Sequence, residues 1–130
     1  MTIELTILVL CCCLGLVQIA VAAHAANLQR GYGWAGGSRD TQPLPVTGIA
    51  GRLQRASANF QETFPFFAAA ILIAHIAGVQ SWMTEWGAYL YFVGRLIFVF
   101  LYASGVALIR SFFWGVALVG IVLVLLAPFV

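Results

Sequence analysis

The sequence has very little charge and no lysine at all. Its 130 residues include six basic residues, all of them arginine, and four acidic residues, so that 8% of the chain is charged. Soluble domains are about 25% charged, and so few charges could not cover the surface of a soluble monomer. A hydrophobic content of 63% excludes intrinsic disorder. A net charge of +2 in so apolar a chain also argues against binding to nucleic acid.

Residues that could hold a metal are few and badly spaced. The three cysteines, Cys11 to Cys13, are consecutive, so on a helix they point about 100° apart and cannot ligate one ion. Their spacing matches no zinc pattern. The two histidines, His24 and His75, fall near opposite ends of different apolar stretches. We therefore expect no metal site, and no nucleophile triad, phosphate loop or haem motif is present.

Long apolar stretches fill most of the chain. Residues 5–29, 63–84 and 111–130 are uncharged, and residues 86–109 contain only Arg95. A membrane-spanning helix needs about 20 apolar residues. The sequence therefore predicts an all-α integral membrane protein, a single domain over residues 1–130. We expect four spanning helices near 3–27, 52–79, 86–108 and 111–129, with one sizeable loop near 28–51 that is rich in glycine and proline.

The first apolar stretch has an alternative interpretation as a cleaved signal peptide. Ala23-His24-Ala25 resembles a small-residue cleavage site. However, the first four residues contain no basic side chain, and the apolar run is longer than a signal peptide needs. These two features favour a retained helix.

The arginines predict the orientation of the chain. Arg30, Arg39, Arg52 and Arg55 lie in or beside the first loop, and Arg110 lies at the third connection. By the positive-inside rule, both connections are expected to be cytoplasmic and both termini outside, as in a bacterial inner membrane. Glu4 and Glu85 would then mark the outer side, where Trp82, Trp86, Tyr89 and Tyr91 would form an aromatic belt.

The second helix carries a polar stripe. Arg52, Arg55, Asn59 and Glu62 follow one another at spacings of 3, 4 and 3 residues, which places them on one face. They climb about 15 Å along the helix, so the stripe must face protein or water rather than lipid. The alternative is a helix end among the lipid head groups. That alternative accounts for Arg52, and for Arg55 at most, but Glu62 lies too deep for it.

Arg95 falls near the middle of the membrane. A charge at that depth costs at least about 2.5–3.5 kcal/mol and needs a partner. Glu62 is the only acidic residue at a comparable depth, so we expect the two to meet, directly or through a ligand. The alternative is a purely structural pair. Tyr102 follows Arg95 at helical spacing. Arg110 either anchors the topology or lies at the mouth of a polar site.

The chain resembles the membrane-associated proteins in eicosanoid and glutathione metabolism, the MAPEG family, and especially its small bacterial members. The resemblance is carried by four helices, a long first loop and the motif Arg52-x2-Arg55-x3-Asn59-x2-Glu62-x2-Pro65. A second match is Arg95-x6-Tyr102 with Arg110-Ser111 after it. The resemblance spans essentially the whole chain.

The resemblance implies a homotrimer that binds glutathione, as a co-substrate, between subunits near the cytoplasmic side. The residues it implies for glutathione binding are Arg55, Asn59, Glu62, Arg95, Tyr102 and, less directly, Arg30. Arg110 and Ser111 are implied to lie at the thiol as catalytic residues. The function implied is a glutathione-dependent transferase or peroxidase whose lipophilic substrate arrives from the lipid.

Simple chemistry makes such a site coherent. Arginines suit the two carboxylates of glutathione, Glu62 suits its amine, and a neighbouring guanidinium lowers the pKa of a thiol from about 8.5. The alternative function is a non-catalytic membrane protein whose polar cleft between subunits binds a lipid head group or stabilises the oligomer. A small transporter is disfavoured, because a pore should show more polar positions than residues 112–130 provide.

Overall fold

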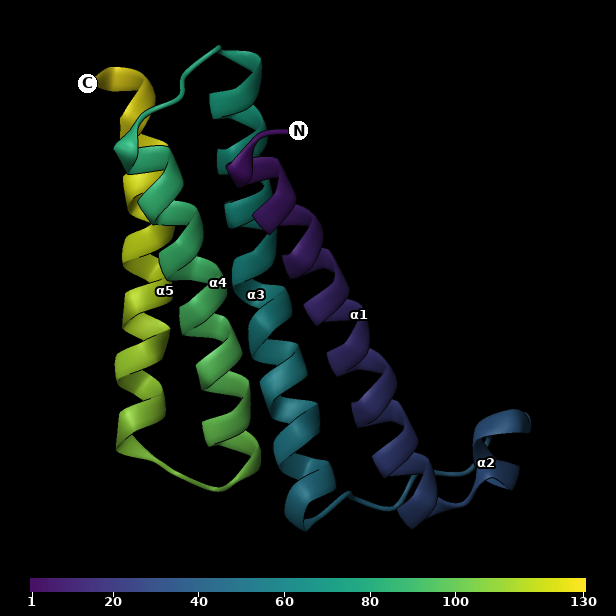
Figure 1. Ribbon diagram of the computed structural model, residues 1–130. Coiled ribbons are helices and arrows are strands. Elements are labelled where there is room, and N and C mark those ends of the chain that lie inside the picture. Colours follow the sequence, from purple (N-terminus) through teal and green to yellow (C-terminus); the bar gives the residue numbers. More distant parts are fainter.

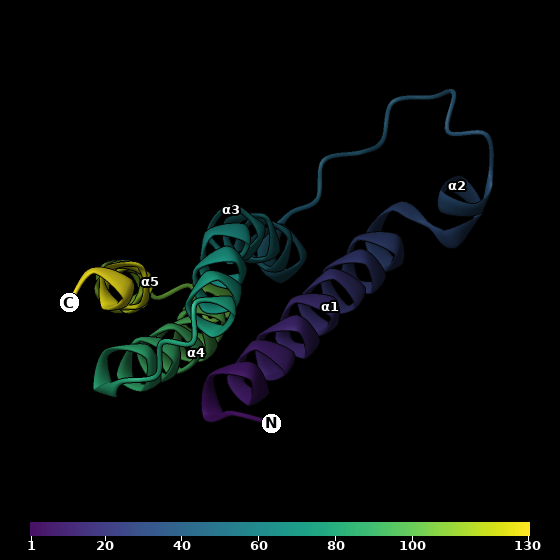
Figure 2. The same cartoon turned by 90° about the horizontal axis from the view of Figure 1, so that it is seen from above.

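The computed structural model describes residues 1–130 and is entirely helical. Its long helices are α1 (Ile3–Arg30), α3 (Gly48–Ile76), α4 (Trp82–Ala103) and α5 (Leu108–Leu126), with a short α2 (Tyr32–Gly36) and a final 3-10 turn (Ala127–Phe129). Figure 1 shows both termini and the α3–α4 connection at one end of the bundle. The α2 segment and the α4–α5 connection lie at the other end. In Figure 2, α1 and α5 form the two edges and α3 and α4 lie between them.

Three of the four long helices are long and apolar enough to cross a membrane. They are α1, α4 and the continuous stretch Leu108–Phe129 that contains α5. The helix α3 is also long, at 29 residues, but it is not one of the three candidate spans by composition. Arg52, Arg55 and Glu62 all lie within it. The prediction of a helical membrane protein is therefore confirmed, with three spans by composition rather than four.

The predicted loop 28–51 is shorter in the structure. Helix α1 continues through Arg30, α2 occupies part of the loop, and α3 already begins at Gly48. The Gln29 side chain closes the loop, because its amide nitrogen donates to the Thr47 carbonyl at 2.9 Å and its oxygen accepts from the Thr47 backbone N–H at 3.0 Å. Gly48 and Gly51, which the sequence assigned to the loop, thus belong to the first turn of α3.

The predicted boundaries 86–108 are wrong by about one turn at each end. Helix α4 begins at Trp82 because Ser81 and Thr84 form a capping box with the backbone N–H groups there. It ends at Ala103, before Gly105, whose φ of 80° is left-handed. Helix α5 consequently begins at Leu108 rather than at residue 111. Glu85 lies in the first turn of α4, where the helix dipole favours an acid.

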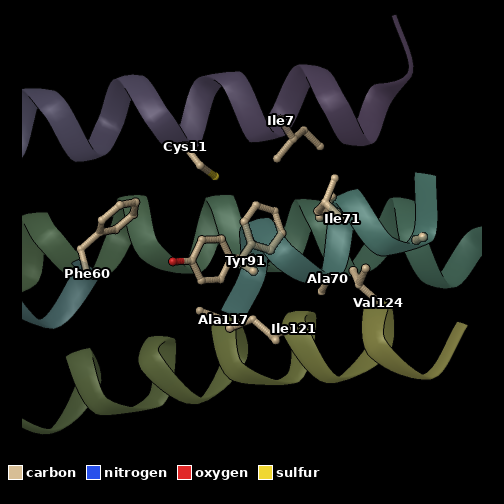
Figure 3. Packing of buried hydrophobic residues seen from close by; sticks show 12 residues of the cluster. Ile7, Cys11, Phe60, Ala70, Ile71, Tyr91, Ala117, Ile121 and Val124 are labelled. Atoms are coloured by element: carbon tan, nitrogen blue, oxygen red, sulfur yellow. The ribbon is translucent and has the colours of Figure 1, made fainter. Parts of the chain in front are cut away.

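The apolar core lies between the four long helices (Figure 3). Tyr91 lies inside it, stacked on Phe67 with ring centroids 4.1 Å apart, and its hydroxyl hydrogen-bonds the Thr63 hydroxyl at 3.0 Å. Tyr91 is therefore not part of an aromatic belt, since the satisfied hydroxyl allows the ring to be buried. Trp82 and Trp86 are exposed, as a belt at this end requires.

Helices α4 and α5 approach each other through glycine. A Cβ atom added at Gly120 would lie 2.5 Å from the Gly87 carbonyl oxygen, and one added at Gly94 would lie 3.0 Å from the Phe113 carbonyl oxygen. Small residues allow such close backbone contact, which is a main source of packing energy between membrane helices. The close pair brings the first turn of α5, with Arg110, against the last turn of α4, with Tyr102.

Candidate functional site

Three of the four residues in the polar stripe of α3, namely Arg52, Arg55 and Asn59, contact α4. Arg55 donates from its Nε to the Tyr102 hydroxyl at 3.2 Å, and one turn deeper the Asn59 side-chain oxygen accepts from Nη1 of Arg95 at 2.9 Å. Glu62, the last residue of the predicted stripe, is exposed and makes no such contact. The antiparallel course of the two helices explains why the later residue on α3 meets the earlier one on α4 (Figure 1).

Arg95 is buried without a counter-charge. Only 1% of its surface is exposed, and its guanidinium lies 4.3 Å from the Phe98 ring centroid and 5.5 Å from that of Phe60. Aromatic faces attract a cation but do not replace its hydrogen bonds. Its Nε and Nη2 atoms are buried and have no hydrogen-bond partner. A buried donor left unpaired costs about 1–3 kcal/mol, and more when charged.

The expected direct contact between Glu62 and Arg95 is absent. Of the three guanidinium nitrogens, one bonds Asn59 and the other two have no partner. Glu62 lies three residues beyond Asn59 on α3 and is exposed. Glu62 is rotated by about 60° around α3 from Asn59, toward the same side as Arg55, whose side chain is also exposed. A contact between the two through a ligand stays a prediction.

Tyr102 lies against two arginines. The Arg110 guanidinium is 4.2 Å from the centre of its ring, and that of Arg55 is 5.8 Å away. Phe98 meets the same ring edge-on at 5.6 Å. No acidic side chain takes part in these contacts. The cluster therefore presents positive charge next to a phenol, at the end of the bundle where the α4–α5 connection lies.

Arg52 has a role that the sequence did not reveal. Its Nε donates to the carbonyl of Ala103 at 3.0 Å, and Ala103 is the last residue of α4. A cation at this position satisfies an unpaired carbonyl and complements the helix dipole. Arg52 therefore fixes the end of α4 on α3, and it holds Tyr102, the preceding residue, in place.

Arg30 and Ser111 are not brought into the cluster within one subunit. Arg30 donates from its Nε to the Leu44 carbonyl at 2.6 Å and lies 5.9 Å from the Trp34 ring. Ser111 is exposed and lines a groove of about 410 Å³ between α4 and α5, which is otherwise mostly apolar. Ser111 follows Arg110 directly in the chain. The mostly apolar groove therefore adjoins the polar cluster around Tyr102 and Arg110.

Glu4 is a second residue whose contacts the sequence did not reveal. It was expected to mark the membrane surface, yet only 6% of it is exposed, and it accepts a hydrogen bond from the Thr84 hydroxyl at 2.6 Å. The sequence does mark the two helix starts, with Thr2 as the N-cap of α1 and Ser81 as the N-cap of α4. Only the fold could show that the two starts lie together.

Comparison with known proteins places the whole arrangement in one family. The model of the MAPEG family matches residues 7–130, a range that includes nearly all of α1 as well as the three later long helices. Searches of curated proteins and of solved structures gave no match. With three candidate spans and a family match over nearly its whole length, the chain is an integral membrane protein that belongs to the MAPEG family.

Proposed function

We propose that the protein binds glutathione and uses it, as a transferase or peroxidase, on a lipophilic substrate. The observation that carries the proposal is the buried guanidinium of Arg95, which has two unpaired donors beside Asn59. A carboxylate would satisfy both donors in the bidentate geometry that arginine favours. Membership of a family that is generally associated with glutathione supports the same ligand.

The rest of the cluster suits the other groups of glutathione. Arg55 would meet its second carboxylate, and the exposed Glu62 carboxylate would meet its amine. Arg110, held against the Tyr102 ring, would lie at the thiol and lower the thiol's pKa, because a nearby guanidinium favours the thiolate. The thiolate is the nucleophile that attacks the electrophile. The apolar groove beside Ser111 gives the lipophilic substrate a route from the lipid.

The proposed assembly is a homotrimer with four spanning helices in each subunit. Polar side chains of α3, among them Gln54 and Gln61, are exposed in the single subunit. With Ser57 they line a groove of about 300 Å³ between α1 and α3. In a bilayer such a surface must be covered by protein or water, and neighbouring subunits would cover it. Arg30 and Ser111, which lie outside the cluster of their own subunit, would act only through a neighbour.

The same reasoning gives the proposed orientation. The five arginines at the end of the bundle away from the termini would face the cytoplasm, with both termini outside, in a bacterial inner membrane. Glutathione would then enter from the cytoplasmic side.

Equilibrium binding of glutathione to the purified protein, read together with the ultraviolet absorbance of the thiolate, tests the proposal. We expect binding at millimolar glutathione with a thiolate signal. Arg110→Ala should abolish that signal and change the binding affinity little. Arg39→Ala is the matched control, because it removes an arginine whose Nε bonds only the Ala35 carbonyl, and it should behave like the wild type.

Two results would contradict the proposal. No binding at millimolar glutathione would exclude a glutathione-dependent enzyme. Binding without a thiolate would favour a glutathione site that has lost catalysis. Equal loss of binding and of thiolate in Arg110→Ala would make Arg110 a binding residue.

A further inference from the structure

A buried carboxylate lies at the opposite end of the bundle from the arginine cluster. Glu4 is 6% exposed. Its Oε1 accepts from the Thr84 hydroxyl at 2.6 Å, while its Oε2 is buried and has no partner. A carboxylate that is removed from water and half satisfied destabilises the fold unless positive charge or further hydrogen bonds reach it.

The helix ends favour the charged form of this carboxylate. Glu4 lies in the first turn of α1, and Thr84 lies in the first turn of α4. The positive ends of two helix dipoles therefore meet at Glu4, and each stabilises a negative charge there. The two dipoles therefore keep the carboxylate ionised, so that a charged oxygen lines the space beside it.

No arginine supplies a counter-charge to Glu4. Arg95 is engaged by Asn59 deeper in the bundle, and the other five arginines are in the loop or at the end where α4 meets α5. His75 is the only basic side chain on the wall beside Glu4, and it is exposed. Apart from the two helix dipoles and the exposed His75, the chain therefore offers no positive charge to the free oxygen of Glu4.

A small cavity adjoins the carboxylate. It measures about 10 Å³, which is room for one water-sized species. Its polar lining comes from Thr2, Glu4, His75, Gln80 and Thr84. Hydroxyl, amide and carboxylate oxygens are hard donors, which suit alkali and alkaline-earth cations. The single carboxylate and the small volume exclude calcium, which takes about 6–8 oxygen ligands.

We propose that this cavity binds one small monovalent cation of the alkali class, with Na⁺ the better fit to the space of one water. The cation contacts the free oxygen of Glu4 and joins the start of α1 to the α3–α4 connection and the start of α4. The site is separate from the arginine cluster, so its failure would leave the proposed function untouched.

Thermal unfolding of the purified protein tests the site at constant ionic strength, with choline replaced stepwise by Na⁺ or K⁺. Choline is too large for the cavity. Above the dissociation constant, each tenfold rise in the concentration of free cation should raise the ratio of folded to unfolded protein about tenfold. Glu4→Gln should show no response to either ion. Glu85→Gln, an acid at the same end that does not line the cavity, should respond like the wild type.

A second variant protects the test against a loss of folding in Glu4→Gln. Gln80→Leu keeps the carboxylate and removes one oxygen from the wall, so its response should move to higher cation concentration. The proposal is overturned if the wild type responds no more to Na⁺ and K⁺ than to choline, which would leave a water in the cavity. It is also overturned if Glu4→Gln keeps the wild-type response.

Discussion

At the scale of single residues, Arg95 is the centre of the candidate site because its charge is buried and only partly satisfied. Asn59 accepts one hydrogen bond and the rings of Phe98 and Phe60 flank the guanidinium, but two donors have no partner. If Arg95 served only to hold the helices together, an acidic residue would be expected at the position of Asn59. Asn59 is neutral, so the positive charge of Arg95 is not cancelled by its partner.

Asn59→Asp should therefore fill the site from within. The new carboxylate would pair with Arg95, so the unfolding temperature should hold or rise, while glutathione should bind about tenfold more weakly, a change of about 1.4 kcal/mol. Gln42→Glu is the matched control, because it makes the same chemical change on an exposed position of the loop. Calorimetric titration measures the affinity, and thermal unfolding measures the unfolding temperature. Unchanged affinity in Asn59→Asp would show that glutathione does not bind at Arg95.

Tyr102 should stabilise the cluster through both its hydroxyl and its ring. Tyr102→Phe removes the acceptor of the Arg55 hydrogen bond and should cost about 0.5–1.5 kcal/mol of unfolding free energy. Tyr102→Leu also removes the contact with Arg110 at 4.2 Å, and should cost about 0.5–1 kcal/mol more. Unfolding in detergent followed by circular dichroism gives both values. Equal losses in the two variants would mean that the ring contributes nothing.

At the scale of helices, the close contact between α4 and α5 sets the position of the site. Gly87 and Gly120 let the two backbones touch, and the short connection then places Arg110 beside Tyr102. The polar contacts from α3, including Arg52 on the last carbonyl of α4, fix the third wall. The geometry of the site thus depends on Gly87 and Gly120, which have no side chain to contact a ligand.

Gly120→Ala should be strongly destabilising. Its Cβ would lie 2.5 Å from the Gly87 carbonyl oxygen and 2.8 Å from the Tyr91 backbone nitrogen, and neither backbone atom can move aside. Overpacking of this kind costs about 1–3 kcal/mol. Gly115→Ala on the same helix has open space around it, and should be neutral or more stable by about 0.5–1 kcal/mol. Thermal unfolding of the pair decides the matter, and equal stability would contradict the close contact.

At the scale of the whole molecule, the single subunit leaves a polar surface that a bilayer does not tolerate. The charges and glutamines of α3 keep that helix out of the candidate spans, although it lies between α1 and α4 in the bundle (Figure 2). If other subunits rather than lipid cover the remaining surface of α3, the helix can lie inside the bundle without an apolar composition.

Ala58→Trp tests that cover. Ala58 is exposed in the subunit and lines the groove with Gln54 and Gln61, so an indole there should block the approach of a neighbour. Native mass spectrometry should give three times the 14.0 kDa subunit mass for the wild type and a smaller species for the variant. Ala58→Ser, which keeps the side chain small, is the control. A trimer that survives Ala58→Trp would place the interface elsewhere.

The sequence by itself determined the membrane class, the four long helices and the polar face of α3, because hydrophobic length and helical periodicity are local properties. It also indicated Arg55, Asn59, Arg95, Tyr102 and Arg110 by their spacing. Only the tertiary structure decided which atoms meet. Asn59 rather than Glu62 reaches Arg95, since a rotation of about 60° along α3 decides between them. Likewise, Glu4 is buried because two helix starts that are distant in the sequence come together. Tyr91 is buried because its ring stacks on a ring from another helix. No local sequence pattern contains either contact.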